Sequence, residues 1–120
     1  MGRDVNKLAV FHIADELVPA VYRATAGFPP EERYGLQSQM RRAAVSTASE
    51  LVEGSTRRTT RDYLRFVEIS LGSASEVRYL ATVAHRLNFL TAAVADDLTS
   101  RYSHVVRGLQ KLIASLEDQP

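Results

Sequence analysis

The 120-residue sequence contains no cysteine and no tryptophan. The lack of cysteine excludes disulfide bonds and thiolate metal sites. No apolar run reaches eighteen residues, and the first ten residues lack the apolar core of a signal peptide, so we expect a cytoplasmic protein without membrane contact. Four prolines and six glycines are too few for a low-complexity chain. The length supports one domain, residues 1–120, with one hydrophobic core.

Neither sign of charge is in large excess, because the formal net charge is only +1. The chain as a whole is therefore not a general polyanion binder. The basic residues are biased in type and position, since thirteen of the fifteen are arginine and six of these fall within 25 positions. Arginine binds phosphate and carboxylate equally well, so the bias permits RNA, DNA or an acidic protein as partner. The six are Arg41, Arg42, Arg57, Arg58, Arg61 and Arg65, opposed in that stretch by Glu50, Glu53 and Asp62.

Apolar residues recur at three- and four-residue spacing in four segments, and no strand-like alternation competes with this pattern. Short connections make consecutive helices antiparallel neighbours, which predicts an all-α, up-down-up-down four-helix bundle. Pro19 predicts a kink or a broken turn within the first helix. The predicted helices span about 6–25, 30–57, 60–87 and 91–117.

Helix starts can be located from capping residues. Thr59 followed by Asp62 resembles a capping box, and Thr91 is expected to begin the last helix. Pro30 with two following glutamates predicts the start of the second helix. The first helix is expected to bury one face, made of Phe11, Ala14, Leu17, Val18, Val21 and Tyr22.

The second and third helices are predicted to form a hairpin that turns near Arg58, with residue i level with residue 117 − i. This register places Thr47 beside Ser70 and predicts an ion pair between Arg42 and Glu76. A polar stripe along the seam permits either acid–base catalysis or a structural network that fixes subunit register, and the second interpretation is favoured because no nucleophile–base–orienter set can be assembled. The network comprises Arg42, Ser46, Glu53, Ser73 and Glu76.

No catalytic residue, metal site or cofactor is expected. The three histidines lie on three different helices without ligand spacing, and no phosphate-binding glycine loop is present. The second helix carries an additional apolar flank through Tyr34, Val45 and Val52. This flank contacts either a thick monomer core or a second copy of the chain, and we expect a homo-oligomer.

Two segments resemble a known family. They are FPPEERYGLQSQMRRAAVSTASELVEGSTR (28–57) and YLRFVEISLGSASEVRYLATVAHRL (63–87). Their order and spacing are similar to those of the bacterial 23S ribosomal RNA intervening sequence proteins, which are related in fold to the accessory proteins of diversity-generating retroelements. The resemblance implies a four-helix bundle that assembles into a ring, commonly a pentamer. Where the family usually has a proline and an asparagine in the second helix, this chain has neither.

These observations lead to one functional hypothesis and one alternative. The hypothesis is a non-enzymatic helical-bundle oligomer that binds nucleic acid through the arginine-rich hairpin end, using Arg41, Arg57, Arg58, Arg61 and Arg65. The alternative is a structural protein–protein assembly module, in which these arginines form a solvated face and Arg57 pairs with Glu53 one turn away.

Overall fold

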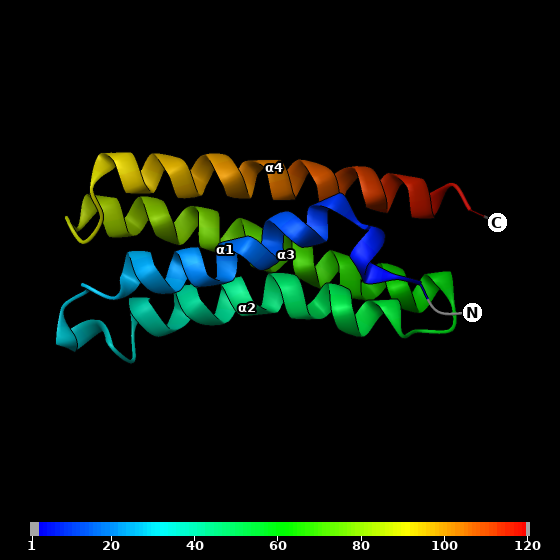
Figure 1. Cartoon of the computed structure of the whole chain (residues 1–120), viewed down its shortest axis with the longest axis horizontal. Helices are drawn as coiled ribbons and strands as arrows, with labels where there is room; N and C mark the ends of the chain where they lie inside the picture. Colours follow the sequence, from blue (N-terminus) through cyan, green and yellow to red (C-terminus); the bar gives the residue numbers. More distant parts are fainter. Residues whose placement is uncertain (1–2, 120) are drawn as a thin grey trace.

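Four long helices account for most of the computed structural model, which describes residues 3–119. They lie side by side along a molecule of 48 × 22 × 19 Å (Figure 1), and these residues contain no β-strand. The fold class is therefore all-α, as predicted. The helices are α1 (Ala9–Thr25), α2 (Leu36–Ser55), α3 (Thr60–Arg86) and α4 (Ala92–Glu117), with the short 3₁₀ helices η1 (Val5–Lys7) and η2 (Pro30–Glu32).

The packing of the helices follows their order in the chain. Helix α3 packs against both α2 and α4, and α1 rests on α2 and α4. Figure 1 shows the α2–α3 turn at the end of the molecule where both termini lie, which we call the hairpin end. The α1–α2 and α3–α4 connections lie at the opposite end, which we call the distal end.

Helix α1 packs its predicted face against the core with one exception, because Phe11 and Val18 are partly buried there and only Tyr22 is exposed. Its buried residues are Val10, Ala14, Leu17, Val21 and Thr25, whereas the predicted core residue Tyr22 is 42% exposed. The prediction for Tyr22 was therefore wrong, because the stripe that begins at Val10 has the same three- and four-residue spacing. The helix is continuous through Pro19, so the predicted broken turn is absent. Pro19 lies on the exposed side.

The second long helix begins later than predicted, at Leu36 rather than Pro30. Pro30 starts only the 3₁₀ turn η2, and Gly35 then takes a non-helical conformation as the N-cap of α2. The Glu32 carboxylate accepts a 3.0 Å hydrogen bond from the Leu36 backbone N–H and so caps α2. A Cβ atom on Gly35 would lie 2.8 Å from Glu32 Oε1, so a side chain at this position would displace the cap.

The other two predicted helix starts are confirmed. The Thr59 hydroxyl accepts a 3.1 Å hydrogen bond from the Asp62 N–H, and the Thr91 hydroxyl accepts one of 3.2 Å from the Val94 N–H. These bonds satisfy N–H groups that have no partner within the first turn of a helix.

The middle of the α2–α3 seam confirms the predicted register but not the predicted ion pair. The Ser70 hydroxyl donates a 2.6 Å hydrogen bond to the Thr47 carbonyl, in a buried position. By contrast, no ion pair joins Arg42 to Glu76, because the single ion pair within 4 Å among residues 3–119 is Asp97–Arg101. Arg42 and Glu76 are both exposed, where water solvates the two charges and pairing adds little stability.

Candidate nucleic-acid interface

The hairpin end displays four arginines around one short connection. Helix α2 ends at Ser55 and α3 begins at Thr60, so the chain reverses within four residues. All four arginines are exposed, and between residues 55 and 66 only one carboxylate, that of Asp62, accompanies them. The resulting surface is locally basic although the whole chain is nearly neutral. It consists of Arg57, Arg58, Arg61 and Arg65 and is called the hairpin patch below.

One arginine of the hairpin patch is fixed by an aromatic ring. The Arg57 guanidinium carbon lies 4.5 Å from the centroid of the Phe66 ring, a cation–π arrangement. Phe66 itself is half-buried. Arg57 makes no ion pair with Glu53 within 4 Å, so the pair expected for a purely solvated face is absent.

The other three arginines of the patch extend into solvent. Within residues 3–119 the side chains of Arg58, Arg61 and Arg65 have neither a hydrogen bond nor an ion pair. Arg61 also lines a cleft with Glu117, the last residue of α4, and with Gln119, which follows the helix. The patch is thus available to an anionic ligand.

The fold adds a fifth arginine that the sequence did not reveal. The Arg3 guanidinium donates a 2.8 Å hydrogen bond to the Thr60 hydroxyl and lies 4.3 Å from the centroid of the Tyr63 ring. Its backbone N–H also donates to the Ser55 carbonyl at 3.1 Å. Burial raises the pKa of Tyr63, and the nearby Arg3 charge partly opposes this rise. Arg3 and Thr60 are 57 residues apart in the chain, so no local sequence pattern predicts this contact.

Arg41, predicted to act with the hairpin patch, lies away from it in the second turn of α2. Its Nε donates to the Thr25 hydroxyl at 2.9 Å, and its Nη2 donates to the Tyr22 carbonyl at 3.1 Å. The Gln37 amide donates to the Thr25 carbonyl at 2.8 Å. These donors satisfy carbonyl groups at the C-terminus of α1, where a cation is also favoured by the helix dipole. Arg41 therefore joins α1 to α2 at the distal end.

The predicted polar network along the α2–α3 seam is brought together only in part. Ser46 and Ser73 form a 2.9 Å hydrogen bond between their hydroxyl groups, across the two helices. Arg42, Glu53 and Glu76 are exposed. The two serines therefore contribute to helix packing, while the three charged residues face solvent.

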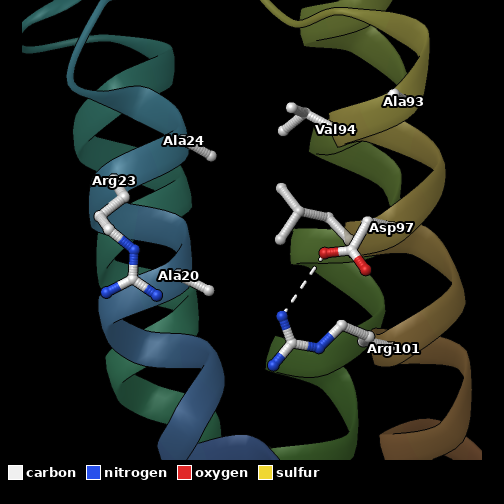
Figure 2. A pocket seen from close by; sticks show the side chains of 8 residues that line it. Ala20, Arg23, Ala24, Ala93, Val94, Asp97 and Arg101 are labelled. Carbon is white, nitrogen blue, oxygen red and sulfur yellow. Dashed lines mark hydrogen bonds and ion pairs between the residues drawn. The ribbon is translucent and has the colours of Figure 1, made fainter.

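Two grooves on the bundle offer apolar surface. One lies between α1 and α4 and has a volume of about 500 Å³; Figure 2 shows Ala20 and Ala24 facing Val94 across it, with the Asp97–Arg101 pair alongside. The other lies between α1 and α2. Its walls include Phe11, Val18, Val45 and Val52, and the two valines are 40% and 43% exposed. The bundle core thus leaves the predicted apolar flank of α2 uncovered at both valines.

Two kinds of feature are missing from residues 3–119. No helix in this range is both long enough and apolar enough to cross a lipid bilayer. No three histidine, aspartate or glutamate side chains gather in this range as a metal site would require.

The fold and the sequence together define a class of small helical-bundle proteins. The 23S rRNA-intervening sequence protein family matches residues 6–111, and the chain belongs to this family. A crystal structure from Bacteroides thetaiotaomicron VPI-5482, described as a protein with unknown function from the S23 ribosomal protein family, is similar with a TM-score of 0.79. The match has 16% sequence identity and covers 88% of this chain and 98% of the other, so it supports the fold alone. No curated protein matches the chain.

Proposed function

We propose that the protein is a non-enzymatic helical bundle that binds nucleic acid through the hairpin patch, with structured RNA as the preferred ligand. The observation that carries this proposal is the exposure of four arginines around one turn without an ion-paired carboxylate. One guanidinium group donates two parallel hydrogen bonds to the oxygens of a phosphate. Its binding releases counterions that are condensed on the nucleic acid.

The geometry of the patch suits a backbone contact. Arg57 is held over the Phe66 ring, so it loses less side-chain freedom on binding than a fully mobile arginine. The exposed residues of the patch include no aromatic ring able to stack on a base. We therefore expect contacts to phosphates, which set affinity and position, with little sequence readout.

We further propose that the bundle has antiparallel up-down-up-down topology and assembles into a homo-oligomeric ring, with a pentamer favoured by the family resemblance. The exposed valines Val45 and Val52 support this, because they line one apolar groove with Phe11 and Val18 that a second copy would cover. A ring would present one hairpin patch per subunit, and several weak contacts on one RNA would then act together.

The alternative function is a structural assembly module that binds another protein and no nucleic acid. The observation that favours it is the pair of apolar grooves on either side of α1. In that case the hairpin patch would serve only solubility.

The test is binding of a fluorescently labelled, structured ribosomal RNA fragment at two salt concentrations. A triple variant, Arg57→Gln, Arg58→Gln and Arg61→Gln, removes three charges from the patch. The matched control, Arg23→Gln, Arg86→Gln and Arg107→Gln, removes three exposed charges elsewhere. We expect the patch variant alone to lower the slope of log affinity against log salt, by about 0.9 per arginine that contacts a phosphate in a duplex. The proposal fails if RNA does not bind at low salt, or if both variants bind equally well.

A further inference from the structure

A second basic surface lies at the distal end, where α1 ends and α2 begins. It is a pocket of about 370 Å³, within the range of about 300–1,000 Å³ typical of small-ligand sites. No carboxylate lines it. The lining residues, called the tyrosine–arginine pocket below, are Tyr22, Arg33, Tyr34, Gln37, Ser38, Arg41 and Arg42.

One wall of this pocket is fixed by the fold. The hydrogen bonds of Arg41 to the end of α1 hold its guanidinium 4.5 Å from the centroid of the Tyr22 ring. They use two of the five N–H groups of that side chain, which leaves further donors for a ligand. Tyr22 is 42% exposed, so its ring and the Arg41 guanidinium form a rigid, partly open platform.

The pocket lining also carries a second tyrosine and two more arginines. Tyr34 is 87% exposed, and the Arg33 guanidinium lies 5.6 Å from the centroid of its ring. Arg42 is exposed and has neither a hydrogen bond nor an ion pair within residues 3–119. The neighbouring Glu32 carboxylate is bound to the Leu36 N–H, so it does not neutralise these arginines. The exposed Tyr34 ring thus lines the pocket together with three arginines, Arg33, Arg41 and Arg42.

We propose that the tyrosine–arginine pocket binds one nucleotide whose base is unpaired. Arg33 and Arg42 bind its phosphate, and the base stacks on the exposed ring of Tyr34. Interleaved arginines and aromatic rings are the arrangement by which proteins bind single strands, because every base offers a π-face. A base in the interior of a duplex is stacked on both sides and has no free face to stack. The inference extends the proposed function, since it adds a site for an unpaired nucleotide at the end opposite the hairpin patch.

The experiment uses a labelled ribo-hexauridylate, a blunt RNA duplex of similar length, and free UMP as competitor. Tyr34→Ala removes the exposed ring, and Tyr34→Phe keeps it. Tyr79→Ala removes a 60% exposed tyrosine from the C-terminal third of α3 as a matched control. We expect Tyr34→Ala to weaken hexauridylate binding about tenfold, because it removes the ring on which a base stacks. Tyr34→Phe and Tyr79→Ala should bind as the parent does.

The arginines are tested by salt dependence. Because both arginines contact one phosphate, the double variant Arg33→Gln, Arg42→Gln should reduce the slope of log affinity against log salt by about 0.7, the value for one single-strand phosphate contact. Arg107→Gln, an exposed arginine of α4, should leave the slope unchanged. All of these positions are exposed, so the variants should fold, and circular dichroism checks this directly.

The remaining measurements distinguish a free nucleotide from a nucleotide within a strand, and the tyrosine–arginine pocket from the hairpin patch. Displacement of hexauridylate by UMP would assign the pocket to free nucleotides as well as strands. Failure of UMP to compete would assign the pocket to a strand alone.

If Tyr34→Ala binds hexauridylate as tightly as Tyr79→Ala does, or if the parent binds duplex as tightly as hexauridylate, the pocket proposal is wrong. Loss of structured-RNA binding in the hairpin-patch variant, with hexauridylate binding intact, would support both proposals. If the patch variant leaves structured-RNA binding unchanged while Tyr34→Ala weakens hexauridylate binding, only the hairpin proposal fails.

Discussion

Gly54 of α2 lies directly against Phe66 of α3, so that a Cβ atom on the glycine would be 2.8 Å from Phe66 Cβ. The same atom would lie 3.1 Å from Cδ1 of the buried Tyr63 ring. The absence of a side chain at residue 54 therefore sets how closely the two helices approach at the hairpin end. Arg57 covers the Phe66 ring and Arg3 covers the Tyr63 ring. This close contact between the helices therefore also positions Arg57 of the hairpin patch and Arg3 beside it.

Replacing Gly54 should destabilise the bundle. Gly54→Ala forces α2 and α3 apart, since the nearest atom is a Cβ that cannot rotate away, and we expect a loss of about 1–3 kcal/mol in the free energy of unfolding. Gly72→Ala is the matched control: Gly72 is helical and exposed with no atom within 4 Å of its Cβ position, so alanine should stabilise by about 1 kcal/mol. Urea unfolding followed by circular dichroism measures both. Equal stability of the two variants would contradict this account of the seam.

The features that were predictable from sequence depend on local geometry. Helical spacing places buried side chains on one stripe, and the caps at Thr59 and Thr91 need only a hydroxyl three residues before an N–H group. The register of α2 on α3 also followed from one short turn, as the Ser70–Thr47 hydrogen bond confirms. These relations involve neighbours in the chain or residues connected through one turn.

The features that were not predictable depend on the choice between two equally spaced stripes and on long, flexible side chains. Tyr22 belongs to a stripe one residue out of phase with the buried one, and only packing against α2 and α4 decides between them. Arg42 and Glu76 lie level on neighbouring helices, but they form no ion pair because both side chains remain hydrated. Arg3 and Arg41 take their roles from residues 57 and 16 positions away, respectively.

Arg41 and Arg42 are adjacent in sequence but should differ in their effect on stability. Arg41→Ala removes two hydrogen bonds from a charged donor to the end of α1, so we expect a loss of about 1.5–3 kcal/mol, the range for hydrogen bonds to a charged group. Arg42→Ala removes an exposed side chain and should change stability by about 0.5 kcal/mol or less. Chemical denaturation of the two variants compares them directly. A larger effect at residue 42 would show that the arginine contacts are assigned wrongly.

Glu50 should make folding stability depend on pH in the acidic range. Burial, and secondly the neighbouring Glu53 charge, raise the pKa of Glu50 above its ordinary value of 4.5. A raised pKa means that the folded state binds the proton more tightly than the unfolded chain does. The stabilising contribution is therefore complete below pH 4.5 and is lost as pH rises through the folded-state pKa. Glu50→Gln, which stays neutral, should raise Tm at pH 7 and lose this advantage at pH 4. A gain of equal size at both pH values would refute the argument.

Replacing Tyr102 with phenylalanine should stabilise the folded protein. Its side chain is fully buried in α4, and among residues 3–119 its hydroxyl is the buried side-chain polar atom without a hydrogen-bond partner. Burial also raises the pKa of this phenol far above its ordinary value, opposed weakly by Arg101. A buried hydroxyl without a partner costs about 1–3 kcal/mol, so Tyr102→Phe should increase the free energy of unfolding by about 1 kcal/mol. Destabilisation in a urea titration would show that the hydroxyl has a partner in solution.

The apolar flank of α2 should control assembly without controlling folding. Val45 and Val52 lie two turns apart on one side of the helix and are exposed in the single chain, so a lysine at either position meets solvent in the monomer. In a ring that buries this flank, the same lysine would be a desolvated, unpaired charge. We therefore expect Val45→Lys and Val52→Lys to lower the mass measured by light scattering to that of a monomer, with an unchanged helical spectrum. Ile69→Lys, at a 50% exposed position of α3, is the control and should keep the parent mass. If the parent is itself a monomer, the ring is excluded. If only the Ile69 variant dissociates, the interface lies on α3.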